Sequence, residues 1–112
     1  MRWTAWRKLA QGQDWYADKF DHEGPACYEL SITGPRGGKR ETVYVGETSN
    51  ERRRISEYGR SGSHLNRHVD SELSAGKCIW YRAIAVNSKA DAKSLQDRML
   101  AKFGYPWNRH GQ

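Results

Sequence analysis

The feature that most restricts how this chain can fold is a pair of short strand-like runs separated by a turn. Residues 26–32 alternate between two faces, and Tyr28 shares one face with the apolar residues that follow it. Residues 34–40 contain three glycines, one proline and three cationic residues, which favours a basic, turn-forming connection. Residues 42–45 then return to strand-forming types. The sequence therefore predicts a hairpin with a half-buried first strand.

Helices and one further strand are predicted after the hairpin. Asn50 is a suitable N-cap for a short helix over residues 51–58, and a second helix is predicted over residues 64–73. Residues 78–86 are almost continuously apolar, as expected of a central strand that is covered on both faces. Ser88, with an acid three residues later, begins a last helix that glycine and proline end.

The amino-terminal segment has the spacing of an amphipathic helix. Trp3, Trp6 and Leu9 recur every three residues, with cationic residues on other faces. The expected fold class is therefore α+β: a small antiparallel three-stranded sheet flanked by helices, with an extra N-terminal helix. Residues 1–23 would form a helical extension that packs on the domain, and residues 24–112 the domain itself, giving one globular domain overall.

The charge of the chain favours a polyanionic partner. Nineteen Lys and Arg against 13 acids give a formal net charge of +6 and a pI near 9.5. Five Trp and six Tyr could stack on exposed bases, but aromatic residues also fill cores. Composition therefore favours nucleic acid as a partner, without showing which aromatic side chains would contact it.

Several other classes of protein are disfavoured. Cys27 and Cys78 lie in apolar strand-like runs, which is typical of buried, reduced thiols in a cytoplasmic protein. The four histidines and two cysteines lack the paired spacing of a zinc site. We also expect no signal peptide, no membrane span and no nucleotide-binding glycine loop, so the expected location is the cytoplasm.

Five polar residues occur in a particular order and spacing along these elements. Tyr28 and Tyr44 lie on the two hairpin strands, Arg54 follows ten residues after the second tyrosine, and Tyr58 follows one helical turn later. Because positions i and i+4 share a helix face, Arg54 and Tyr58 can point into one site. Asn108 lies in the last segment, beyond the predicted final helix.

This order of elements and residues resembles the GIY-YIG nuclease domain, over about residues 24–108. The first signature is degenerate, Ala26-Cys27-Tyr28, and the second is the close variant Tyr44-Val45-Gly46. The resemblance implies a single-domain, stand-alone, metal-dependent DNA endonuclease that leaves 5′-phosphate and 3′-hydroxyl ends. It also implies one Mg²⁺ or Mn²⁺ ion per site, held by a helix glutamate.

The resemblance assigns a role to each of the five residues. It implies that Tyr28 accepts the proton of the attacking water, that Tyr44 orients water or phosphate, and that Arg54 holds the scissile phosphate. Tyr58 would donate to a phosphate oxygen, and Asn108 would tie the last segment to the site. Because a phenol titrates near pH 10, a tyrosine base needs nearby positive charge to lower its pKa.

Gln96 occupies the position of the family's metal-binding glutamate. It falls within the predicted inner stripe of the last helix, whose other members are Ala92, Leu95, Met99 and Phe103. An amide is a weak ligand for a hard cation, so fold and DNA binding should survive while turnover falls, as in an engineered inactive variant or a natural member that has lost catalysis. If another carboxylate replaced the missing glutamate as metal ligand, Glu47 would be a better candidate than Asp97. A hydrogen-bonded helix glutamine is the simpler reading of Gln96 taken alone.

The remaining cationic residues are candidates for contacts with DNA, although each could equally lie on a solvated face. These candidate nucleic-acid-binding residues are Arg36, Lys39, Arg40, Arg52, Arg53, Arg60, His64 and Arg67. His68 is expected to pack rather than bind. The strandedness of the DNA stays open, and we expect a monomer or weak homodimer with no membrane contact. The alternative function is a non-catalytic nucleic-acid-binding module on the same fold.

Overall fold

A five-stranded antiparallel sheet organises the chain, in the order β2-β1-β5-β3-β4. The computed structural model describes residues 2–12, 14–16, 22–59 and 65–108. The elements are β1 (Arg7–Gln11), β2 (Asp14–Trp15), β3 (Ala26–Gly34), β4 (Gly37–Thr48), α1 (Glu51–Gly59), α2 (Asn66–Ser74), β5 (Cys78–Ala85), α3 (Lys89–Lys102) and the 3₁₀ turn η2 (Pro106–Asn108). The α+β class is confirmed, with two more strands in the sheet than predicted.

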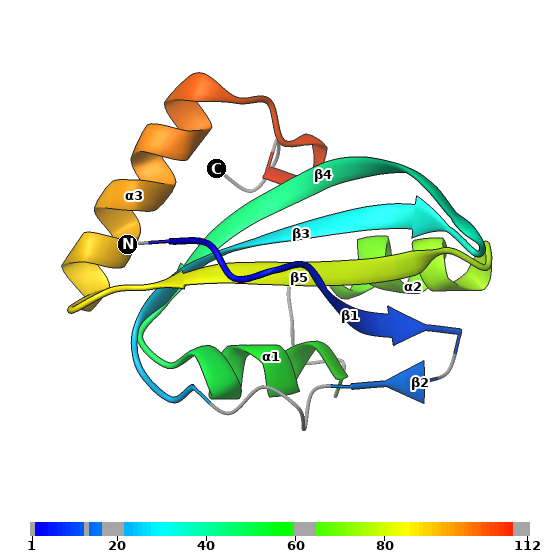
Figure 1. The fold of residues 1–112 in the computed structure, drawn as a ribbon, viewed down its shortest axis with the longest axis horizontal. Coiled ribbons are helices and arrows are strands. Elements are labelled where there is room, and N and C mark those ends of the chain that lie inside the picture. Colours follow the sequence, from blue (N-terminus) through cyan, green and yellow to red (C-terminus); the bar gives the residue numbers. More distant parts are fainter. Residues whose placement is uncertain (1, 13, 17–21, 60–64, 109–112) are drawn as a thin grey trace.

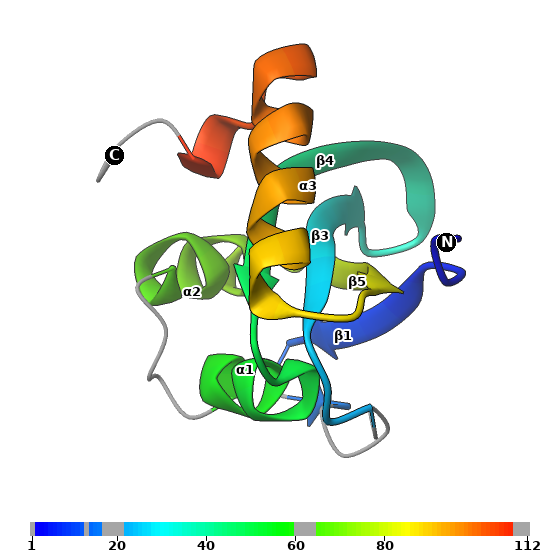
Figure 2. The same cartoon turned by 90° about the vertical axis from the view of Figure 1, so that its left-hand side faces the viewer.

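The described helices cover both faces of the sheet. Helices α1 and α2 cover the face on which Tyr28, Leu30 and Tyr81 pack into the main core. The first residues of the chain lie on the other side of β3 from α2 (Figure 2). Helix α3 packs against β3 and β4 (Figure 1). One face of the sheet therefore faces two helices, and the other faces α3 and the amino-terminal segment.

The predicted amino-terminal helix is wrong, because residues 7–11 form β1. One edge of β5 pairs with β3, and β1 pairs with the other edge. This pairing gives hydrogen-bond partners to main-chain N–H and C=O groups that would otherwise be left without them. A register shift between Lys8 and Ala10 lets the neighbouring residues Leu9 and Ala10 both become fully buried. Adjacent apolar residues do not fit the alternation of a regular strand, which is why the sequence favoured a helix here.

Strand β3 is buried on both faces, not half-buried as predicted. It lies between β5 and β4, and residues 26–33 are all buried. Glu29 is only 3% exposed, and its carboxylate accepts from Arg82 Nε at 2.7 Å and from the Tyr105 hydroxyl. These partners make burial of a charge tolerable on a face that the sequence alone assigned to solvent. The prediction that the strand over residues 78–86 is central is confirmed, since β5 lies third of five.

The connection between β3 and β4 is shorter than the predicted basic loop. Gly34 pairs with Gly37, so only Pro35 and Arg36 lie between the strands. Gly37 and Gly38 have φ values of 91° and 93°, which favour glycine because other residues meet a steric cost there. Arg40 therefore belongs to β4 and not to a flexible loop.

Helix α3 begins as predicted but ends before Phe103. The Ser88 side chain accepts from the Asp91 N–H, which confirms the cap. Phe103 has an extended backbone, with φ −126° and ψ 152°, and its side chain is 50% exposed. Its predicted place in the inner stripe is wrong, because the helix that defined the stripe ends at Lys102. None of the helices within the described ranges is long and apolar enough to cross a membrane.

The packing of Tyr28 depends on the absence of a side chain at Gly46. A methyl group there would lie 2.6 Å from the Tyr28 hydroxyl oxygen and 2.8 Å from the ring of Tyr44. We expect Gly46→Ala to lower the free energy of unfolding by about 1–3 kcal/mol, because a buried ring must shift. Urea denaturation measures this. Gly104→Ala is the matched control, since open space surrounds Gly104 and this change should not lower stability. Equal losses in both variants would contradict the packing argument.

Candidate functional site

The hairpin brings Tyr28 and Tyr44 together on one face of the sheet. Tyr28 in β3 stands opposite Gly46, while Tyr44 in β4 stands opposite Leu30. The two tyrosines are therefore diagonal neighbours, with ring centroids 6.0 Å apart. The spacing of the two signature strands thus places both phenols at one point in the core, as the hairpin prediction required.

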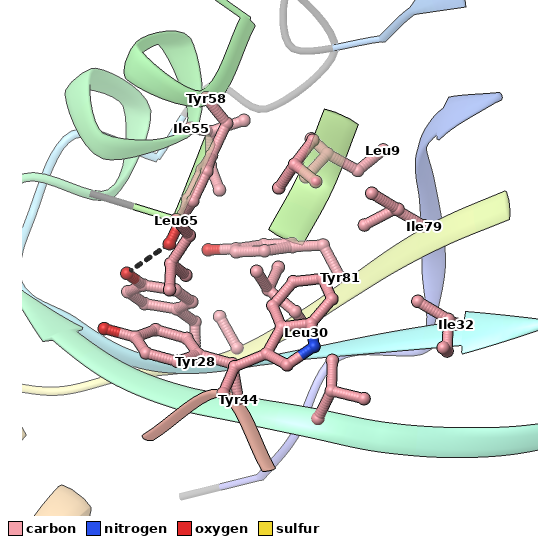
Figure 3. Packing of buried hydrophobic residues seen from close by; sticks show 14 of the residues in the cluster. Leu9, Tyr28, Leu30, Ile32, Tyr44, Ile55, Tyr58, Leu65, Ile79 and Tyr81 are labelled. Carbon is pink, nitrogen blue, oxygen red and sulfur yellow. Dashed lines mark hydrogen bonds between the residues drawn. The ribbon is translucent and has the colours of Figure 1, made fainter. Parts of the chain in front are cut away.

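Helix α1 adds a third phenol to this pair. Asn50 caps the helix by accepting from the Arg53 N–H at 3.0 Å, which confirms the predicted start. Two turns later Tyr58 reaches the sheet, and its hydroxyl oxygen lies 2.9 Å from that of Tyr28 (Figure 3). Tyr28 is 0% exposed and Tyr58 2%, so this hydrogen bond satisfies two buried hydroxyls at once.

Arg54 lies one helical turn before Tyr58 and is the charged member of the site. Its side chain is 28% exposed, and its Nε lies 3.2 Å from Glu57 Oε1. That separation makes an ion pair, but its angles are not those of a hydrogen bond, and the buried Nε has no hydrogen-bond acceptor in the described part of the chain. Arg54 therefore retains donor capacity that an anion could satisfy.

The electrostatics of the cluster link Arg54 to the phenols. Burial on its own would lower the pKa of Arg54, but the neighbouring phenols of Tyr28 and Tyr58 raise it above its ordinary value. We name Tyr28, Tyr44, Arg54 and Tyr58 the tyrosine–arginine cluster. Its guanidinium is firmly charged and half-buried, which suits it to hold a phosphate.

Burial opposes the proton-accepting role that the resemblance assigns to Tyr28. Loss of hydration raises the pKa of Tyr28 well above its ordinary value, and the positive charge of Arg54 offsets this only in part. Burial likewise raises the pKa of Tyr44. The lowered pKa that a tyrosine base requires is therefore absent from this conformation, in which the Tyr28 hydroxyl is also shielded from water.

Asn108 and Gln96 both contact the main chain of Val45, next to Tyr44. The Asn108 side chain accepts from the Val45 N–H at 3.0 Å and donates to the Val45 carbonyl at 3.0 Å. It thus occupies the outer edge of β4 as a neighbouring strand would. Gln96 donates from Nε2 to the same carbonyl at 3.5 Å. Both residues therefore lie beside the second signature strand.

The residues around Gln96 do not suit a divalent cation. Within the described residues, no three His, Cys, Asp or Glu side chains gather closely enough to hold a metal ion. Glu47, the predicted substitute ligand, is paired with Lys89 at 2.9 Å, and Asp97 lies 3.3 Å from Lys93 on an exposed surface. Gln96 turns an amide nitrogen, which cannot bind a cation, toward Val45. Position 96 therefore carries an amide where the resemblance implies the carboxylate that would hold Mg²⁺ or Mn²⁺.

The candidate DNA-binding residues are spread over several surfaces. Arg52 and Arg53 are exposed on α1, and Arg67 is exposed on α2. Arg36 and Lys39 are exposed near the hairpin turn. Arg40 is half-buried on the opposite face of the sheet, against Trp6 and Trp80, while Arg60 and His64 lie outside the described residues. The described candidates are therefore divided among α1, α2, the hairpin turn and the opposite face of the sheet.

Sequence reasoning missed two buried partners of the site. The Tyr81 hydroxyl donates to Glu51, which begins α1, and the Tyr81 ring stacks on Tyr28 with centroids 5.8 Å apart. A tyrosine in a central apolar strand needs a polar partner, and that need was the available signal.

His68 packs as predicted. Its ring stacks on that of Trp107, with ring centroids 5.1 Å apart.

Comparison with known proteins gives one family and one curated relative. The family model for GIY-YIG domain-containing proteins matches residues 21–112. The chain is 31% identical to Protein EFFECTOR OF TRANSCRIPTION 2 of Arabidopsis thaliana, over 95% of this chain and 31% of that protein. The chain thus spans about a third of the length of this relative. No solved structure gives a significant match.

The raised pKa values of the buried tyrosines predict how stability changes at high pH. Below about pH 10, Tyr28 is protonated in the folded and the unfolded chain and contributes no pH dependence. Above about pH 10, the phenol ionises in the unfolded chain first, so the free energy of unfolding should fall as pH rises. Urea denaturation between about pH 9 and about pH 11 measures this slope.

Two variants isolate the contribution of Tyr28 to this slope. Tyr28→Phe should make the decline in stability shallower, because it removes a phenol whose pKa is raised by burial. Tyr16→Phe, which changes a half-exposed tyrosine, should follow the parent chain. A parent-like slope in Tyr28→Phe would show that the Tyr28 phenol ionises as readily in the folded chain as in the unfolded one.

Proposed function

This chain belongs to the GIY-YIG domain family, and we propose that it binds DNA at the tyrosine–arginine cluster without hydrolysing it efficiently. The observation that carries this proposal is the contrast between the two halves of the site. The half that would hold phosphate is assembled, with Tyr28 and Tyr58 hydrogen-bonded 2.9 Å apart. The half that would hold a metal presents the Gln96 amide where a nuclease of this family has a carboxylate.

Three features support nucleic acid as the partner. The fold is of the nuclease type, and the chain has a formal net charge of +6. Arg54 is the charged group of the cluster and is 28% exposed, and its planar guanidinium can bind two phosphate oxygens together. The contribution of Arg54 to binding would therefore come from phosphate contact, which is independent of base sequence.

Hydrolysis would need two further functions that these residues supply poorly. A water that attacks phosphorus must lose a proton, and the buried Tyr28, whose pKa is raised, is a weak acceptor. The leaving oxygen gains negative charge, and the amide of Gln96 cannot hold the cation that would stabilise it. We therefore place this chain on the binding side of a family whose members are generally metal-dependent nucleases.

The curated relative supports a role that does not require cleavage. Its name describes an effector of transcription, a function compatible with binding DNA and leaving it intact. Metal-dependent hydrolysis to 5′-phosphate and 3′-hydroxyl ends is the second candidate function. The proximity of Tyr28, Tyr58 and Arg54 favours it, and it would require a carboxylate at position 96.

Replacing Gln96 by glutamate tests the proposal. With labelled single-stranded and duplex DNA, we expect the chain as it stands to bind and not cut in Mg²⁺, Mn²⁺ or chelator. Gln96→Glu should bind with similar affinity and cut slowly, only with metal, because it restores the carboxylate while the buried Tyr28 stays a weak proton acceptor. Ser94→Glu adds the same charge on the exposed face of α3 and should leave the chain inactive.

Each other outcome has a defined meaning. Metal-dependent cutting by the chain with Gln96 would contradict the proposal and establish the nuclease reading. If both the parent chain and Gln96→Glu bound DNA without cutting it, DNA binding would remain the function. That result would also show that Gln96 is not the only feature that prevents hydrolysis. Absence of binding to any DNA would rule out both candidate functions.

A further inference from the structure

The face of the sheet opposite the tyrosine–arginine cluster carries a second arrangement of aromatic and cationic side chains. Glu29 follows Tyr28 in β3, so the two side chains point to opposite faces. On the Glu29 face, tryptophan rings and cations alternate in space. We name this the tryptophan–cation ladder, and its members are Trp3, Arg82, Trp6, Arg40, Trp80 and Lys8.

The contacts within the ladder are close and continuous. The Arg82 guanidinium carbon lies 4.5 Å from the Trp3 ring centroid and 4.6 Å from that of Trp6. Arg40 lies 4.8 Å from Trp6 and 4.9 Å from Trp80, and the Lys8 ammonium nitrogen lies 5.5 Å from Trp80. These separations are within cation–π range, and they hold the planar guanidinium groups in fixed positions.

The ladder keeps positive charge that no carboxylate balances within the described residues. Arg82 is neutralised by Glu29, with Nη2 2.6 Å from its carboxylate. Arg40 donates to the neutral Ser31 hydroxyl at 2.8 Å, and Lys8 donates to the neutral amide of Gln11 at 2.8 Å. Arg40 and Lys8 are half-exposed, so both can contact an anion in solvent.

A hollow of about 400 Å³ lies at the Trp3 end of the ladder. Its aromatic walls include Trp3, Phe103 and Tyr105, and Arg82 and Glu29 also line it. Phe103 is 50% exposed beside this hollow, which is unusual for a large apolar side chain. The volume is within the range of sites for small ligands.

The polar groups of the hollow suit a neutral, planar ligand. Glu29 and Arg82 form an ion pair with no net charge, so the pair attracts neither a cationic nor an anionic ligand strongly. Arg82 uses Nε and Nη2 on Glu29, which leaves Nη1 as a donor, and Thr42 adds a hydroxyl. Donors and acceptors between aromatic walls match a heteroaromatic ring with a polar edge, as in a nucleobase.

We infer that the hollow accepts one unpaired nucleobase of a single-stranded nucleic acid, while Arg40 and Lys8 contact its phosphates. This inference rests on the proposed function, because that proposal makes nucleic acid the partner. It adds a second contact surface, on the opposite face of the sheet from the tyrosine–arginine cluster, that selects single-stranded over fully paired substrate. Duplex DNA buries its base faces by stacking and cannot fill the hollow without unpairing.

Phe103→Ala is the direct test, because Phe103 is half-exposed and its removal should not unfold the chain. Binding is measured by fluorescence anisotropy with a labelled oligothymidylate and with a labelled hairpin duplex, in chelator. Phe103→Ala should weaken binding of the single strand roughly five- to a hundredfold, as expected for loss of one stacked base, and leave duplex binding unchanged. Leu100→Ala is the matched control, since Leu100 is 38% exposed but does not line the hollow.

A second variant tests the cationic part of the surface. Lys8→Gln should reduce the slope of log K against log salt for the single strand by the amount expected for about one phosphate contact. The slope for the duplex should not change. The inference would be overturned if Phe103→Ala bound the single strand as tightly as the parent chain does, or if Leu100→Ala lost as much affinity as Phe103→Ala. If duplex binding persisted in that case, the proposed function would still stand. A chain that binds neither probe would overturn both.

Discussion

The close contact between Tyr28 and Gly46 is the constraint on which the rest of the site depends. Because position 46 has no side chain, the Tyr28 ring can pass over Gly46 and reach the core between the sheet and α1. There its hydroxyl meets Tyr58 near the end of α1, while its ring stacks on Tyr81, which binds Glu51 at the start of α1. Helix α1 is thus attached to the sheet near both ends, and Arg54 lies between these attachments. The position of the guanidinium follows from the packing of buried aromatic rings.

The same burial that positions Arg54 limits what the site can do. Removing Tyr28 from water gives the cluster its rigidity and also raises the pKa of the phenol, so its ability to take a proton is reduced. At the other side of β4, Asn108 and Gln96 use amide groups to satisfy the Val45 main chain. Amides stabilise a strand edge well and bind hard cations poorly. These features support our proposal that the site binds phosphate and turns over little substrate.

Local signals in the sequence predicted the elements that depend on local chemistry. The hairpin, the Asn50 cap, the central strand and the Ser88 cap were readable because turns and caps need particular residue types. β1 was not, because it is stabilised by the open edge of β5 and its bulge hides the strand alternation. The two-sided burial of β3 was hidden for a similar reason, since Glu29 is tolerated only with Arg82 and Tyr105, residues far away in sequence. The spacing of Tyr28, Arg54 and Tyr58 predicted that they meet but could not predict how deeply they are buried, and the domain boundary at residue 23 stays a prediction.

We propose that Arg54, held by buried tyrosines, is the group that contacts phosphate. The most direct measurement is the nuclear magnetic resonance signal of the Arg54 Nε–H during titration of the isotope-labelled chain with short DNA in chelator. Because this nitrogen has no hydrogen-bond acceptor in the described part of the chain, the account predicts a large shift and slower exchange with solvent as phosphate binds. An unchanged Arg54 signal, with shifts confined to exposed arginines such as Arg52 and Arg53, would show that DNA binds only the outer surface. The tyrosine–arginine cluster would then be part of the core and not a binding site.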